Sequence, residues 1–360
     1  MEKMLNCNSK TLEKLFIDSH EWNTVIKNLN HVRVEEKREE LELKDFADPR
    51  SVWPIIEEAG INVHYDCPVV EQLVSGQNVV SSYPRDLFVA QIEEDSANKM
   101  ARRNGVVVVS ANNPSLEQIK RPVLPFDVIQ GTKVSWNDIF MCIKESPRIP
   151  LNSLVLIDRY LFVNHDDYNC NTNKKNIIKI LTEALPINYS DRFDVLIITS
   201  DENLHTGTRA SFDDIIMELT ETCKELRDYD INLEVLVLIN DIFNRGKGDK
   251  RIWDESHDRR IITNYYRIVA TKGFVAFGGA KTDEVLRTQT ITVDCAFSNI
   301  DNKYSNLLGF PIKGYDATLT EICHYVSTHK QSSPRYTFYQ DGEKRKDLSA
   351  FKNRIVLMQK

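Results

Sequence analysis

The sequence predicts an α/β protein whose second half contains a mainly parallel sheet flanked by helices. Continuous apolar runs recur at Leu154–Ile157, Phe193–Thr199 and Val235–Ile239, and runs without polar alternation are typical of strands that are covered on both faces. Segments with helical spacing of apolar residues separate these runs, and this order of strand and helix favours a parallel sheet. We expect a separate α/β region, residues 1–150, to precede it.

Composition bounds the class of protein. The chain has 360 residues, 41% hydrophobic and 28% charged, which suits a soluble protein of two domains. The net charge of −7 argues against nucleic-acid binding over the whole surface, because phosphate backbones require a local excess of cations. A local patch remains possible, since residues 329–360 hold eight Lys/Arg against three Asp/Glu.

The cysteines and the N-terminus suggest a reducing compartment. The seven cysteines are scattered and form no CxxC pair, so we expect reduced thiols, no metal centre and no cofactor. The first residues lack the apolar core of a signal peptide, and no apolar run approaches the roughly 20 residues of a membrane span. We therefore expect a cytoplasmic protein with no transmembrane segment.

The first 150 residues contain both helix and strand signals. We predict helical structure in the first 30 residues, and we interpret the charged stretch Glu35–Glu42 as a solvated helix face. Ser51 caps a short helix that has Pro54 in its first turn. An apolar stripe predicts a longer helix over Arg85–Arg103, followed by a buried strand at Val106–Ser110.

Pro147 and Pro150 mark the expected domain boundary. The chain then divides into an N-terminal region of unknown role (1–150), a central domain (151–300) and a basic C-terminal extension (301–360). In the extension, Asp341-Gly342 is typical of a hairpin turn.

Helices and further strands complete the central domain. We expect helices at Lys174–Leu185 and after a Ser211 cap, the second burying a face from Phe212 to Leu226. No obvious helix separates the last three apolar blocks, so we expect antiparallel neighbours; these blocks are Ile261–Val269, Phe274–Phe277 and Thr290–Phe297.

The segment His257-Asp258-Arg259-Arg260-Ile261 leads into the first of these blocks, and Asn264 follows with the spacing His-x-Arg-x4-Asn. In an extended strand, residues two apart point to the same face. His257 and Arg259 would project together, one as a nucleophile or base and one as a phosphate ligand. Asp258 and Arg260 would point to the opposite face, as surface or ion-pair residues.

This motif and the order of elements resemble the phospholipase D-like domain found at the C-terminus of MIT-domain proteins. That family carries Asp-Pro-Tyr after its first strand, where this chain has Asp158-Arg159-Tyr160, and His-Asp-Arg-Glu-Ile at its signature strand, where this chain has His257-Asp258-Arg259-Arg260-Ile261. The resemblance covers residues 151–300. It implies a phospholipase D-like mixed sheet flanked by helices, and a degenerate form of the family's His-x-Lys-x4-Asp signature.

The resemblance implies recognition of phosphate. Arg259 replaces the lysine that binds phosphoryl oxygens, and its guanidinium fork suits phosphate. Asn264 replaces the aspartate, so binding should survive better than turnover. We expect Arg259, Asn264, Lys247, Lys250 and Arg251 to contact phosphate, His257 to be the candidate nucleophile, and Asp158, Tyr160 and Asp258 to support them.

Three functions remain open. The first is a module that binds nucleic acid or another phosphodiester ligand; prokaryotic relatives of the family suggest defence against foreign nucleic acid. The second is a metal-independent phosphodiesterase or nuclease, which would need a homodimer because no other histidine repeats the motif. The third is a scaffold for protein contacts in which His257 merely pairs with Asp258.

Overall fold

The computed structural model describes residues 4–27, 29–41, 46, 48, 50–115, 126–144, 151–162, 171–201, 212–239, 259–278, 284–295, 315–331 and 335–357. The chain forms two compact units. Unit 1 comprises residues 1–121 with 188–190, and unit 2 comprises 122–187 with 191–360. The division therefore lies earlier than the prolines 147 and 150 suggested, and the described part of 301–360 belongs to unit 2.

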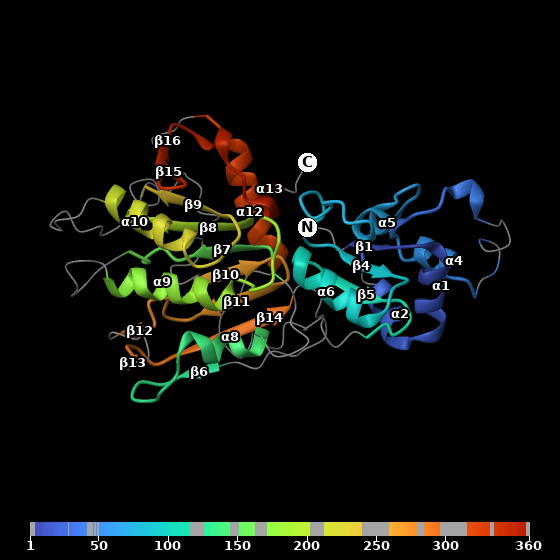
Figure 1. Cartoon of the computed structure of the whole chain (residues 1–360), viewed down its shortest axis with the longest axis horizontal. Coiled ribbons are helices and arrows are strands. Elements are labelled where there is room, and N and C mark those ends of the chain that lie inside the picture. Colours follow the sequence, from blue (N-terminus) through green and yellow to red (C-terminus); the bar gives the residue numbers. More distant parts are fainter. Residues whose placement is uncertain are drawn as a thin grey trace. The chain divides into compact units, whose positions relative to one another are not determined.

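Unit 1 is built on a five-stranded parallel sheet in the order β3-β2-β1-β4-β5 (Figure 1). The strands are β1 (Met4–Cys7), β2 (His31–Val34), β3 (Asn62–His64), β4 (Leu87–Ala90) and β5 (Val107–Ser110). The helices are α1 (Ser9–Asp18), α2 (His20–Lys27), α4 (Val52–Glu58), α5 (Val69–Val74) and α6 (Glu94–Asn104), with a 3₁₀ turn at Arg38–Glu40. An α/β N-terminal region is confirmed.

The helical prediction over Arg85–Arg103 was wrong in part. Leu87–Ala90 is strand β4, and the helix is Glu94–Asn104. All four residues of β4 are buried between β1 and β5, so its apolar residues show no alternation that would separate strand from helix.

The prediction of a solvated helix face for Glu35–Glu42 was also wrong in part, since only Arg38–Glu40 form an exposed 3₁₀ turn. The Glu35 carboxylate accepts the Glu71 N–H (3.0 Å), and the Glu36 carboxylate accepts the Ser9 N–H (2.8 Å). These two side chains therefore satisfy backbone donors in the first turns of α5 and α1, which the helices themselves leave unpaired. By contrast, the predicted Ser51 cap of α4 is confirmed, since Ser51 accepts the Trp53 N–H.

Unit 2 is built on a nine-stranded mixed sheet in the order β16-β15-β9-β8-β7-β10-β11-β14-β6 (Figure 1). The three central strands are parallel: β7 (Ser153–Ile157), β8 (Phe193–Ser200) and β9 (Ile231–Leu238). The remaining pairings are antiparallel and use β6 (Phe126–Val128), β10 (Arg260–Thr263), β11 (Tyr266–Ala270), β14 (Gln289–Cys295), β15 (Tyr336–Gln340) and β16 (Glu343–Arg345).

The parallel core confirms the predicted α/β class, and the blocks that begin at Ile261 and Thr290 are antiparallel neighbours as predicted. Of the block Phe274–Phe277 only Phe277 lies in a strand, and that strand belongs to a separate two-stranded sheet. The block Ile261–Val269, however, is two strands rather than one. Thr263 ends β10 because its hydroxyl accepts the N–H groups of Tyr265 (3.2 Å) and Tyr266 (2.8 Å), which turns the chain back into β11. The hairpin at Asp341-Gly342 is confirmed, with φ of 53° and 85°.

Helices cover both faces of the unit 2 sheet. On one face, Tyr339 of β15 donates to Asp213 (2.5 Å) of α10 (Phe212–Lys224), which packs beside α9 (Asn171–Ala184). On the other face, Arg260 of β10 donates to Thr318 of α12 (Tyr315–Thr328). The remaining elements are α8 (Trp136–Lys144), the hairpin β12 (Phe277–Gly278) and β13 (Glu284–Val285), a 3₁₀ turn at Leu348–Ala350, and α13 (Arg354–Leu357).

Asn176 of α9 ties α8 and the β12 hairpin to the core. Its fully buried amide accepts the Trp136 indole N–H (2.9 Å) and the Phe277 N–H (3.2 Å), and it donates to the Phe277 carbonyl (2.7 Å). Trp136 packs edge-to-face on the Phe277 ring, with centroids 5.3 Å apart.

We predict that Asn176→Leu destabilises the protein by on the order of 2–4 kcal/mol, because it strands two buried donors that each cost about 1–3 kcal/mol. The measurement is the free energy of urea unfolding. Lys175→Ala, at an exposed position of the same helix, is the control and should change it by less than about 0.5 kcal/mol. Equal effects of the two changes would contradict the role assigned to Asn176.

Candidate functional site

The sheet of unit 2 brings Asp158 and Arg259 together at the end of β7. β10 pairs antiparallel with β7, with Arg260 opposite Ile157, so the residue before β10 lies beside the residue after β7. Arg259 Nε is 3.6 Å from Asp158 Oδ1. This position is the carboxyl edge of the parallel strands, the edge at which ligands bind in open α/β sheets.

Asp158 is buried (2% exposed), and its carboxylate accepts two backbone N–H groups. Its Oδ1 accepts the Tyr160 N–H and its Oδ2 accepts the Phe274 N–H, both at 2.9 Å. Burial raises the pKa of Asp158, and the Arg259 charge and the two N–H donors oppose that rise. A carboxylate in this position orients its neighbours and is too enclosed to meet a large ligand itself.

Arg259 is fixed on three sides. Its Nη1 donates to the Thr271 carbonyl (3.2 Å), its Nε faces Asp158, and its guanidinium carbon lies 5.5 Å from the centre of the Tyr160 ring. Arg159 also lies over that ring, at 5.6 Å. The Arg259 side chain keeps 13% of its surface exposed, and among the described residues its Nη2 edge has no protein partner.

The structure thus joins three predicted site residues, Asp158, Tyr160 and Arg259, into one cluster. The candidate nucleophile and the cations of the preceding loop lie outside the described residues; these are Lys247, Lys250, Arg251, His257 and Asp258.

Asn264, expected to bind phosphate, lies at the other end of β10. Its side chain is fully buried, and its Oδ1 accepts the Asn152 N–H (3.2 Å) at the start of β7. The pairing of Thr263 with Leu154 places Asn264 at the amino edge of the parallel strands, so the structure does not bring it to Arg259. Its contact fixes the beginning of β7.

Arg260 also departs from expectation. It does point away from the Arg259 face, but it is 2% exposed and donates to Thr318 of α12. Of the two predicted roles, surface residue or ion-pair residue, the first was wrong, because α12, which follows β10 by more than 50 residues, covers that face. Spacing around the motif could not show which helix would lie there.

The loop from Thr271 to Phe274 was missing from the predicted site. It supplies the Thr271 carbonyl to Arg259 and the Phe274 N–H to Asp158. Between them, Gly273 has φ of 106°, in the region that favours glycine. That single glycine between two strands was the available signal, since a glycine at such a point often marks a close approach of the backbone.

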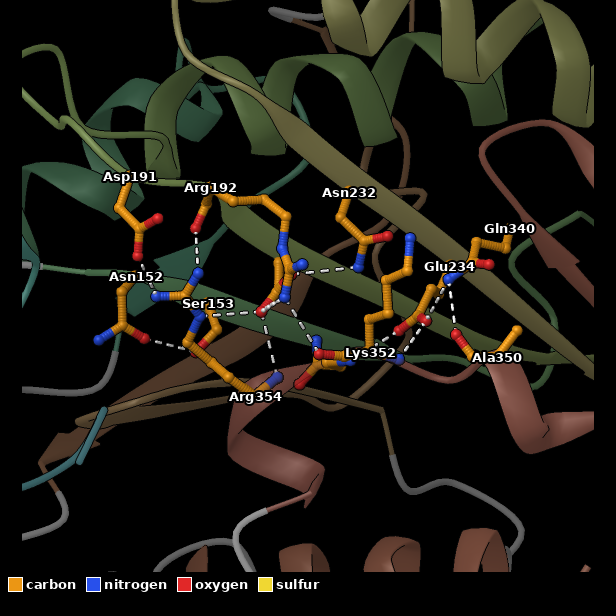
Figure 2. A network of polar contacts seen from close by, with 12 residues as sticks. Asn152, Ser153, Asp191, Arg192, Asn232, Glu234, Gln340, Ala350, Lys352 and Arg354 are labelled. Carbon is orange, nitrogen blue, oxygen red and sulfur yellow. Dashed lines mark hydrogen bonds and ion pairs between the residues drawn. The ribbon is translucent and has the colours of Figure 1, made fainter. Parts of the chain in front are cut away.

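A second buried polar cluster lies at the amino edge of the same sheet (Figure 2). Asp194 of β8 accepts from Arg354 Nε (2.9 Å), Arg192 Nε (2.8 Å), Asn232 Nδ2 (3.1 Å) and the Arg354 N–H (3.1 Å). Both carboxylate oxygens are therefore fully used inside the protein.

Glu234 of β9 completes this cluster. Its carboxylate accepts the backbone N–H groups of Lys352 (2.6 Å) and Asn353 (3.0 Å) and the Gln340 amide (3.2 Å). Three successive backbone N–H groups of the C-terminal segment thus bind two buried carboxylates. We infer a structural role, because these bonds hold residues 352–354 against the sheet and the carboxylates accept from groups of the chain itself.

Burial raises the pKa of Glu234 to about 8; the three N–H donors oppose this rise and Asp194 adds to it. The folded state therefore holds a proton that the unfolded chain, at the ordinary value of 4.5, has lost. The contribution of this group to stability is complete below pH 4.5 and is lost as the pH rises towards 8.

We predict that the free energy of urea unfolding falls as the pH rises between 4.5 and about 8, by on the order of 5 kcal/mol at most. Glu234→Gln should flatten this dependence because the amide cannot titrate. Glu343→Gln is the control, since Glu343 lies on the neighbouring hairpin with 72% of its side chain exposed. A slope that persists in Glu234→Gln would show that another group causes it.

Metal binding and membrane insertion receive no support in the described part of the chain. No group of three or more His, Cys, Asp or Glu side chains there is placed to hold a metal ion. None of the described helices combines the length and the apolar character needed to cross a bilayer.

No protein-family model matches the chain, and no curated protein sequence matches it. The assignment of a function therefore rests on the geometry of the Asp158–Arg259 cluster and on the resemblance of the motifs that form it.

Proposed function

We propose that unit 2 is a phospholipase D-like module that binds a phosphate group of nucleic acid, or of another phosphodiester ligand, through Arg259. One observation carries the proposal. Three residues meet at the carboxyl edge of the parallel strands although they lie up to 101 positions apart in the sequence: Asp158, Tyr160 and Arg259. Among the described residues, none contacts the remaining edge of the Arg259 guanidinium.

Arg259 has the properties of a prepared anion ligand. Its guanidinium is held by Asp158, by the Thr271 carbonyl and by the Tyr160 ring, so little side-chain freedom is lost when a ligand binds. Charge-assisted bonds from arginine to phosphate are shorter and stronger than neutral hydrogen bonds. A single fixed arginine, with one edge that no described residue contacts, supports recognition of an oxygen of one phosphate group.

Asp158 supports the proposal as a positioning residue. It is buried and bonded to two backbone N–H groups, and its Oδ1 lies 3.6 Å from Arg259 Nε, so a fixed carboxylate restrains the guanidinium. Supporting side chains of this kind hold a binding group in a productive geometry.

Further cations favour a polyanionic ligand. Arg159 lies beside Tyr160, and the exposed Lys272 adjoins Gly273. In sequence, Lys247, Lys250, Arg251 and His257 precede Arg259 within 12 positions, interleaved with Asp249, Asp254, Glu255 and Asp258. A cluster of cations with an aromatic ring suits single-stranded nucleic acid, which is bound through its backbone and its bases.

Cleavage would need more than binding. A phospholipase D-type reaction requires two histidines, and the motif occurs once, so a nuclease of this type would be a homodimer with His257 from each copy. The binding module is favoured because Arg259 and Asp158 already form a complete positioning unit within one chain, whereas the reaction requires groups beyond it.

We predict that Arg259→Ala lowers the affinity for a labelled single-stranded oligonucleotide in EDTA by about 10- to 100-fold, since a hydrogen bond to a charged group contributes about 1.5–3 kcal/mol. The measurement is fluorescence anisotropy over a salt series. Arg102→Ala removes the same charge from an exposed position in unit 1 and should leave the affinity unchanged.

The same experiment separates the alternatives. Retention of an intact strand, lost in Arg259→Ala only, supports the binding module. Cleavage by the wild type that vanishes in His257→Ala would replace it with the nuclease. Neither binding nor cleavage of single- or double-stranded DNA or RNA would contradict nucleic-acid recognition and favour a scaffold.

A further inference from the structure

The loop Thr271–Phe274, between β11 and β12, packs against both Asp158 and Arg259. The Thr271 carbonyl accepts from Arg259 Nη1 (3.2 Å), and the Phe274 N–H donates to Asp158 Oδ2 (2.9 Å). One end of the loop therefore holds the cation and the other end holds the anion.

Gly273 is the residue that packs against both members of the pair. A Cβ atom placed on Gly273 would lie 2.9 Å from Asp158 Oδ2, 3.1 Å from Arg259 Cδ and 3.2 Å from Arg259 Nε. Cβ contacts below 3.0 Å are essentially never observed in proteins, and φ of 106° is already unfavourable for an L side chain. Any side chain at this position would separate the carboxylate from the guanidinium.

The loop cannot easily move away to relieve such a collision. Gln289 of β14 is 5% exposed; its amide donates to the Gly273 carbonyl (3.1 Å) and accepts the Lys272 N–H (3.0 Å). The Thr271 N–H also donates to the Thr290 carbonyl (3.2 Å). The backbone on both sides of Gly273 is thus bonded to β14, so a clash must be relieved by the side chains of the pair.

We propose that Gly273 is a positioning residue for phosphate binding: its bare Cα, held by Gln289, lets Asp158 and Arg259 meet and thereby fixes the direction of the guanidinium. This inference rests on the proposed function of Arg259. It differs from a purely structural role, in which Gly273 would affect stability while the Arg259 contact with a ligand stayed the same.

The test measures the affinity of the full chain for a labelled single-stranded oligonucleotide in EDTA across a salt series. Each lost phosphate contact lowers the slope of log K against log[salt] by about 0.7 for a single strand. Gly273→Ala should lower both the affinity and this slope as Arg259→Ala does. A smaller folded fraction would lower the apparent affinity by the same factor at every salt concentration and would leave the slope unchanged.

Gly131→Ala is the matched control. Gly131 also lies in unit 2 with φ of 88°, but nothing lies within 4 Å of a Cβ placed there. It imposes similar backbone strain without a collision at the site, so the salt slope should remain that of the wild type.

A double substitution tests whether Gly273 acts through Arg259. In the Arg259→Ala background, Gly273→Ala should cause no further loss of affinity, because the group that it positions is gone. If Gly273→Ala does not fold, Gln289→Leu releases the same loop without adding bulk beside the pair, and it should also lower the salt slope.

The outcomes are distinct. If the wild type does not bind the oligonucleotide, the proposed function fails and this inference fails with it. If the wild type binds and Arg259→Ala lowers the slope, but Gly273→Ala or Gln289→Leu keeps the wild-type slope, the proposed function stands and this inference is overturned.

Discussion

The antiparallel pairing of β10 with β7 is the constraint on which the candidate site depends. It sets Arg260 opposite Ile157, and Arg259 therefore lies beside the buried carboxylate of Asp158. Because side chains alternate along a strand, a shift of one residue in this register would exchange Arg259 with Arg260. Arg260 is fixed to Thr318 on the opposite face, and this contact opposes such a shift.

The two edges of the parallel core are organised differently. At the amino edge, Asp194 and Glu234 are saturated by donors from the chain and fasten residues 352–354 to the sheet (Figure 2). At the carboxyl edge, Arg259 keeps one guanidinium edge that no residue in the described part of the chain contacts. Buried polar groups are tolerated when their hydrogen bonds are satisfied, so the saturated cluster is structural and the open one is the candidate for binding.

Unit 1 also uses a carboxylate of the chain to bond a backbone donor at the end of its sheet. Its strand order reverses between β1 and β4, the position where doubly wound sheets bind ligands. Here Glu36 bonds the Ser9 N–H at the start of α1. A carboxylate of the chain thus uses a donor at the helix end that could otherwise bind an anion.

The sequence by itself determined the α/β class, the apolar strands β7 and β8, and the helices that follow them, because these depend on local periodicity. The resemblance of short motifs marked Asp158, Tyr160 and Arg259 as site candidates, but it did not predict that they meet. Only the tertiary structure decided that Leu87–Ala90 is a strand, that α12 buries Arg260, that Asn264 lies at the far edge, and that Gly273 packs on the Asp158–Arg259 pair. These features depend on contacts between residues distant in sequence, and no local pattern encodes which distant segment covers a given face.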